Sequence, residues 1–182
     1  DARQFLAFVP LFSLSLFLSS FHSLVSLSLC LDSNTLANNP RYESECTKVN
    51  DLLYVSGIKV AENRELLGGV GITHVVNCAG ITTPNYFPDQ FQYKTLYIHD
   101  EPSANLVPHM YDVLEFIDGA KKAGGKVLVH CTQGVSRSCS FCIAYLMLNH
   151  KVSYEEGYGT VKAKRGICNP NVSFSGQFSR QK

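Results

Sequence analysis

The nine residues His130–Ser138, which read HCTQGVSRS, bring a cysteine, a glycine and an arginine together at short spacing. They follow the mostly apolar run Lys126–Val129, which is typical of a buried strand, and they precede an apolar stretch long enough for a helix. We therefore predict that a strand delivers Cys131 into a tight loop and that a helix begins at Arg137. In such a loop the backbone N–H groups converge, the helix contributes its positive dipole end, and the arginine can grip two oxygens in a fork. The segment is expected to bind a phosphate dianion.

The same electrostatic field would stabilise a thiolate, so we expect Cys131 to be ionised at cell pH and to act as a nucleophile. A reactive thiolate persists only where thiols stay reduced. The chain has seven cysteines, an odd number at uneven spacing, which is not the pattern of a disulfide framework. These features favour a cytoplasmic or nuclear location.

The pattern HCxxGxxR followed by Ser, matched at Cys131, Gly134, Arg137 and Ser138, resembles the signature of the cysteine-based protein phosphatases. Other stretches are similar to the dual-specificity branch of that family, and most similar to the plant-type MAP kinase phosphatases. They are GITHVVNCAG (71–80), AYLML (144–148), VKAKRG (161–166) and NPNVSF (169–174). The resemblance covers residues 45–177, about three quarters of the chain.

The resemblance implies a role for each residue of the loop. Cys131 attacks phosphorus to form a cysteinyl-phosphate intermediate, and Ser138 hydrogen-bonds the thiolate and helps it leave. His130 lies beneath the loop and orients Cys131 rather than acting as a base. The remaining positions bind the phosphate through backbone amides and one guanidinium, and they are Thr132, Gln133, Gly134, Val135, Ser136 and Arg137. No metal or cofactor is required by this chemistry.

This chemistry also needs an acid that protonates the departing oxygen of the substrate. Asp100 follows a predicted strand at residues 93–98 and opens the loop DEPSAN (100–105). The resemblance implies that the catalytic aspartate lies in this loop. Glu101 is the local alternative, and either side chain could instead be a solvated loop carboxylate.

Two residues outside the loop are expected to support it. Asn171 matches an asparagine that supports the loop in the related family. Cys78 closes a predicted strand at residues 74–78, which the family resemblance places beside the strand that ends at Cys131. It is therefore a candidate redox partner of Cys131, the alternative being an ordinary core residue.

Charge gives little indication of a partner. The net charge is +1 at pH 7 and no block of like charge appears, so we expect no nucleic-acid partner. The basic residues that end a predicted helix at residues 153–164 could dock an acidic kinase segment or could simply be a solvated helix end. They are Lys162, Lys164 and Arg165.

The N-terminal residues 1–40 have a different composition and are expected to lie outside the catalytic domain, which we assign to residues 45–182. No charged side chain occurs from Phe5 to Leu31, as in a membrane span or a targeting segment. Every residue from Pro10 to Phe21 is Pro, Leu, Phe or Ser, the amino acids whose codons begin with two pyrimidines. Translation of a pyrimidine-rich leader and a membrane or targeting segment both stay open, and membrane association depends on which is correct.

The remaining pattern predicts an α/β fold, with a single domain in which helices flank a central, mainly parallel sheet. The resemblance implies that this fold is phosphotyrosine-phosphatase-like, of the dual-specificity type. Strands are expected at residues 49–56, 74–78, 93–98 and 126–130. Helices are expected at residues 62–69, 105–123, 138–149 and 153–164. Ligands bind at the carboxyl ends of parallel strands, and Cys131 follows such an end.

We interpret the chain as a protein phosphatase that acts on phosphotyrosine and on phosphoserine or phosphothreonine, with a MAP kinase as the expected substrate. A phosphoinositide or RNA 5′-phosphate hydrolase is the chemical alternative. The side chains at the variable loop positions argue against inositides because they are all neutral, whereas lysines would suit a multiply phosphorylated headgroup. These positions are Thr132, Gln133, Val135 and Ser136. A catalytically weak phosphate-binding module is the non-enzymatic alternative.

Overall fold

The computed structural model describes residues 40–179 of the chain. Its strands are β1 (Thr47–Lys48), β2 (Leu53–Ser56), β3 (His74–Asn77), β4 (Gln92–Thr95) and β5 (Val127–His130). Its helices are α3 (Pro40–Ser44), α4 (Ile58–Ala61), α5 (Arg64–Val70), α6 (Val107–Lys122), α7 (Arg137–His150), α8 (Tyr154–Lys164) and α9 (Val172–Ser179). The predictions made for residues 1–39 lie outside the described residues.

The strands of this region form one sheet in the order β1-β2-β5-β3-β4. Strands β2, β5, β3 and β4 are parallel, and the short β1 is antiparallel to β2. The central strand β5 is buried along its whole length, as expected for a strand with parallel neighbours on both sides and helices on both faces. The predicted α/β fold with a mainly parallel sheet is confirmed.

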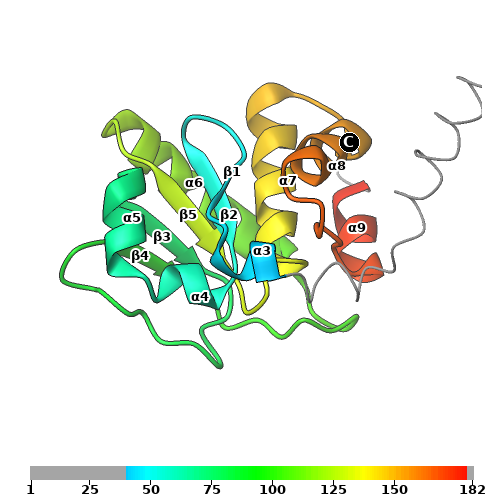
Figure 1. Cartoon of the computed structure of the whole chain (residues 1–182). Coiled ribbons are helices and arrows are strands. Elements are labelled where there is room, and N and C mark those ends of the chain that lie inside the picture. The colour runs from blue at the N-terminus through cyan, green and yellow to red at the C-terminus, as the bar shows by residue number, and fades with distance from the viewer. Residues whose placement is uncertain (1–39, 180–182) are drawn as a thin grey trace, which may run out of the picture.

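Helices cover the sheet on two sides (Figure 1). The short helices α4 and α5 pack on one face, where Val60 and Leu67 meet Tyr54, Val75 and Leu128 of the strands. The longer helices α6 and α7 lie on the other face with α8 and α9 beyond them, and together they enclose the larger of the two apolar cores (Figure 1). Helix α7 is almost entirely buried over its first ten residues, Arg137 to Leu146. The end of β5 and the start of α7 are therefore buried between these layers.

Several predicted elements are shorter than the sequence pattern indicated. The predicted strand at residues 49–56 is only β2, because Asn50 closes a turn by accepting hydrogen bonds from the backbone N–H groups of Leu52 and Leu53. The predicted helix at residues 62–69 corresponds to α5 alone, which begins at Arg64 because the Asn63 side chain caps it; α4 is a separate short helix before it that was not predicted. The predicted strand at residues 93–98 ends at Thr95.

The helices that adjoin the site match the sequence pattern more closely. Helix α8 begins with a capping box, in which Ser153 and Glu156 satisfy each other's backbone N–H groups. Helix α9 was not predicted as a separate element. It begins after Asn171, whose side-chain oxygen accepts a hydrogen bond from the Phe174 N–H at 3.1 Å. No helix within residues 40–179 is both long and apolar enough to cross a membrane.

Candidate active site

The loop between β5 and α7 holds Cys131 in a buried position, with 2% of the residue exposed. The backbone N–H of Gly134 donates a hydrogen bond to Cys131 Sγ at 3.2 Å. The Ser138 hydroxyl lies 3.3 Å from the same sulfur. Two hydrogen-bonding groups, the Gly134 N–H and the Ser138 hydroxyl, therefore contact Cys131 Sγ.

The backbone N–H groups in the first turn of α7 donate no hydrogen bond to an N-cap side chain. Ser136 occupies the N-cap position of α7, but its hydroxyl makes no capping hydrogen bond. That hydroxyl instead donates a hydrogen bond to Asp100 Oδ1 at 2.8 Å. The N–H groups at the start of a helix attract anions, so this end of α7 suits a phosphate.

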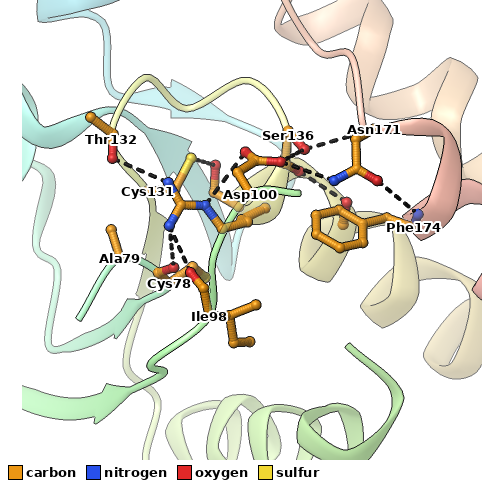
Figure 2. Close-up of polar contacts among 12 residues, drawn as sticks. Cys78, Ala79, Ile98, Asp100, Cys131, Thr132, Ser136, Asn171 and Phe174 are labelled. Atoms are coloured by element: carbon orange, nitrogen blue, oxygen red, sulfur yellow. Dashed lines mark hydrogen bonds and ion pairs between the residues drawn. The ribbon is translucent and has the colours of Figure 1, made fainter. Parts of the chain in front are cut away.

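Arg137 is held above the loop by residues that follow two other strands. Its Nη1 donates to the carbonyl oxygens of Cys78 at 3.2 Å and Ile98 at 2.9 Å, and its Nη2 donates to Thr132 Oγ1 at 3.2 Å (Figure 2). Its Nε lies 3.4 Å from Asp100 Oδ2. Two backbone carbonyls thus fix Nη1, Nη2 contacts the loop at Thr132, and the buried Nε makes no hydrogen bond among the described residues. The edge formed by Nε and Nη2 is the one with which a guanidinium grips two oxygens of an anion.

Asp100 reaches the loop from the segment between β4 and α6. Besides the Ser136 hydroxyl, its Oδ1 accepts a hydrogen bond from Asn171 Nδ2 at 3.0 Å (Figure 2). The Asn171 backbone N–H in turn donates to Ser136 Oγ at 3.1 Å. Three segments far apart in the sequence therefore converge on one carboxylate, which lies beside Arg137.

His130 lies beneath the loop and is almost fully buried. Burial lowers the pKa of His130 to about 4, an effect that contact with the Cys131 backbone offsets only in part. Its ring nitrogens make no hydrogen bond of good geometry among the described residues. A neutral, enclosed imidazole is consistent with the expectation that His130 packs under Cys131 and does not act as a base.

Cys78 follows β3 and lies beside the end of β5, where Cys131 begins the loop. The register of β3 and β5 pairs Asn77 with His130, so Cys78 and Cys131 are the next residues along the two adjacent strands. The Cys78 backbone N–H donates to the His130 carbonyl at 2.8 Å. Burial, together with the neighbouring Cys131, raises the pKa of the Cys78 thiol well above its ordinary value. The predicted proximity of these two cysteines is therefore present in the fold.

The structure brings the residues named from the sequence into one site, with Glu101 exposed beside it. Sequence reasoning missed the side-chain role of Ser136, which was expected to contribute only its backbone. It also misjudged Arg165, since neither a docking residue nor a solvated helix end would be fully buried, as Arg165 is. Within residues 40–179 no group of three or more His, Cys, Asp or Glu side chains is arranged to hold a metal ion.

Comparison with known proteins agrees with this geometry. The model of the "Dual specificity phosphatase, catalytic domain" family matches residues 53–182. Among curated relatives, protein-tyrosine-phosphatase MKP1 of Arabidopsis thaliana is 41% identical over 136 residues, which are 75% of this chain and 17% of that protein. Human dual specificity protein phosphatase 1 is 38% identical over 125 residues, 69% of this chain and 34% of that protein. The chain therefore spans well under half the length of these relatives.

Solved structures show the same fold. The human tyrosine phosphatase-like serine/threonine/tyrosine-interacting protein superimposes with a TM-score of 0.70 at 33% identity, covering 74% of this chain and 93% of that one. DUSP15 superimposes with a TM-score of 0.69 at 29% identity, covering 73% of this chain and 84% of that one.

Proposed function

This chain belongs to the dual-specificity phosphatase family, and from that premise we propose that its folded domain hydrolyses phosphotyrosine and phosphothreonine or phosphoserine in proteins through a cysteinyl-phosphate intermediate. The observation that carries the proposal is the position of Asp100. Its carboxylate lies against Ser136 and 3.4 Å from Arg137 Nε, at the mouth of the loop that holds Cys131. A nucleophile, an anion clamp and an acid gathered around one loop are the groups that this reaction needs.

The first chemical step transfers the phosphoryl group to the enzyme. Cys131 Sγ forms a bond to phosphorus while the bond from phosphorus to the substrate oxygen breaks, and Asp100 gives its proton to that oxygen. Arg137 and the backbone N–H groups of the loop hold the equatorial oxygens throughout. The Gly134 N–H and the Ser138 hydroxyl, which contact Cys131 Sγ, stabilise the thiolate before it attacks.

The second step restores the enzyme. A water molecule attacks phosphorus, Asp100 accepts the proton of that water, and the bond between sulfur and phosphorus breaks to release inorganic phosphate. Ser138 stabilises the departing thiolate through its 3.3 Å contact with Cys131 Sγ. Asn171 and Ser136 keep the Asp100 carboxyl in place between the two steps, because each donates a hydrogen bond to Oδ1.

As substrate we propose a phosphorylated MAP kinase, for which the sequence resemblance to plant-type MAP kinase phosphatases is the support. The proposed setting is the cytoplasm or the nucleus, where such kinases act and where thiols stay reduced. An inositide substrate is less suited to this loop, because the side chains at its variable positions are neutral: Thr132, Gln133, Val135 and Ser136. A purely phosphate-binding module is disfavoured because the nucleophile, the arginine and the acid are all present.

The proposal is tested by phosphate release from a peptide that carries phosphothreonine and phosphotyrosine in a kinase activation-loop sequence. The expected result is release from both residues, with Cys131→Ser as the inactive control. A polyphosphorylated inositide and an RNA oligonucleotide with a 5′-phosphate are the comparison substrates. Faster turnover of either comparison substrate than of the peptide would contradict the assignment to protein substrates, and no turnover of any substrate would leave only the binding function.

A further inference from the structure

Arg165 follows α8 and is fully buried, yet among the described residues it forms no ion pair with a carboxylate. Its charge is compensated by oxygen atoms of other kinds. Nε donates to the Gly134 carbonyl at 2.6 Å and Nη2 donates to the Gln133 carbonyl at 3.2 Å. Both acceptors belong to the loop that carries Cys131, so Arg165 supports the phosphate-binding loop from its protein side.

These two hydrogen bonds fix the orientation of two consecutive peptide units. In a trans peptide the C=O and the following N–H point in opposite directions. The Gln133 carbonyl points to Arg165, and the N–H of the same peptide unit, that of Gly134, points to Cys131 Sγ at 3.2 Å. The Gly134 carbonyl also points to Arg165, which turns the Val135 N–H away from the protein interior and toward the open side of the loop.

The backbone at Gly134 depends on this arrangement. Its φ of 70° lies in the left-handed region, and a Cβ at this position would collide with the Ser56 backbone and with Arg165 itself. A glycine is therefore needed for the loop to approach the guanidinium this closely. The sequence at Gly134 and the buried charge at Arg165 form one structural unit.

The other side of the guanidinium contacts a segment that precedes the part matched by the family model, which begins at residue 53. Nη1 donates to Thr47 Oγ1 at 3.0 Å and approaches the Glu45 carbonyl at 3.4 Å. Nη2 also donates to the Tyr42 carbonyl at 3.2 Å. The segment from α3 to β1 is thereby linked to the phosphate-binding loop through one side chain.

We propose that Arg165 is a positioning residue of the active site, which aims the Gly134 N–H at the thiolate and the Val135 N–H at the phosphate, and which is itself held by residues 42–47. A buried cation is costly to desolvate, and apolar replacements of buried charged groups often preserve or raise stability. The free energy of unfolding therefore gives little reason for an arginine at this position. The orientation of the Gly134 and Val135 N–H groups gives a catalytic reason for it. This inference deepens the proposed phosphatase activity and depends on it.

The test compares four variants with the wild-type chain. Arg165→Met removes the donors, Arg165→Lys keeps the charge but not the fork, and Thr47→Val removes one acceptor at nearly constant volume. Lys164→Met is the matched control, because Lys164 is the adjacent cation and its side chain is exposed. For each we would measure kcat and KM on an aryl phosphate, the acid limb of the kcat/KM profile, and the rate of Cys131 alkylation by iodoacetamide against pH.

Both Arg165 variants are expected to lose roughly 10²-fold in kcat/KM, the usual effect of removing a preorganised donor from a transition-state oxyanion. Thr47→Val is expected to lose about fivefold, which corresponds to one hydrogen bond. In these three variants the acid limb and the alkylation profile move to higher pH, because the thiolate loses its Gly134 donor. Lys164→Met leaves all three measurements unchanged. A role limited to stability would lower the melting temperature without moving either pH profile.

The proposal is overturned if a folded Arg165 variant, with wild-type circular dichroism, keeps kcat/KM within threefold of wild type and leaves the acid limb in place. If neither Arg165 variant folds, Thr47→Val decides, and unchanged pH profiles there overturn the proposal. Failure of the phosphatase assignment would look different. The wild type would then hydrolyse no aryl phosphate, while alkylation of Cys131 would still report whether Arg165 aims the Gly134 N–H.

Discussion

Replacing Asp100 by alanine is expected to lower kcat by roughly 10²–10⁴, the range contributed by a positioned general acid. That loss corresponds to about 2.7–5.5 kcal/mol of transition-state stabilisation. The structure supports a value in this range because the carboxylate is held in place before substrate arrives. Its Oδ1 accepts hydrogen bonds from Ser136 at 2.8 Å and Asn171 at 3.0 Å, and its Oδ2 lies 3.4 Å from Arg137 Nε.

The contribution of each supporting hydrogen bond follows from its exposure. A hydrogen bond to a charged group contributes about 1.5–3 kcal/mol when buried. The Asp100 side chain is 31% exposed, so solvent reduces this to about 1 kcal/mol. Asn171→Ala is therefore expected to lower kcat about fivefold, far less than removal of Asp100 itself.

The assay measures kcat on substrates whose leaving groups differ in basicity. For an alkyl phosphate such as phosphothreonine the departing oxygen needs a proton, so Asp100→Ala shows its full loss. For an aryl phosphate with an acidic leaving group the loss is smaller. Glu101→Ala, which changes the exposed neighbour, is the control and is expected to be nearly silent. An equal loss on all leaving groups, or a large loss in Glu101→Ala with a small one in Asp100→Ala, would refute the reasoning.

Three further predictions concern the rest of the site. Cys131→Ser is expected to abolish turnover while retaining phosphoprotein binding, and more than a tenth of wild-type turnover in this variant would contradict the mechanism. Arg137→Lys is expected to lower turnover roughly 10²–10³-fold, because the point charge of lysine cannot replace the forked guanidinium. Burial lowers the pKa of His130 to about 4 from 6.5, so the unfolded chain binds more protons between these values and stability falls as pH falls through that window. The free energy of unfolding measured in urea is expected to be about 2 kcal/mol lower at pH 5 than at neutral pH because of His130. In His130→Gln the free energy of unfolding is expected to depend less on pH. Mild peroxide is expected to inactivate the enzyme reversibly through a Cys78–Cys131 disulfide. Peroxide oxidises Cys131 to a sulfenic acid, the Cys78 sulfur then bonds to the Cys131 sulfur, and the hydroxyl of the sulfenic acid leaves with the thiol proton as water. Peptide mapping finds the link, and unchanged recovery by thiol in Cys78→Ser, compared with Cys142→Ser, would remove this idea.

The strand–loop–helix form of the segment around Cys131 could be predicted from the sequence because its parts are contiguous. Cys131, Gly134 and Arg137 lie within seven residues, and a strand followed by a helix leaves a chain of that length few ways to turn. The predicted start of a helix at Arg137 is confirmed. The parallel sheet could likewise be predicted, since strands that alternate with helices have few other arrangements.

The assignment of Asp100 came from the resemblance, and only the fold shows how its carboxylate is held. Its partner Ser136 is 36 residues away and Asn171 is 71 residues away. No local pattern specifies which polar side chains meet across such distances, because the meeting point depends on how α7 and α9 pack. For the same reason, the sequence led us to predict that Ser136 contributes only its backbone N–H.

Arg165 marks the limit of the sequence most clearly. At the end of a helix, next to two lysines, an arginine looks like a solvated charge with favourable dipole contacts. Its partners are backbone carbonyls of the loop and Thr47, which lies 118 residues earlier in the chain. Every residue has a backbone carbonyl group, whatever its side chain. An arginine whose hydrogen-bond acceptors are mostly backbone carbonyls therefore cannot be recognised from the sequence. The sequence determined which groups we propose for the chemistry, because they lie together in one loop, whereas only tertiary packing placed the buried Arg165 against the carbonyls of that loop.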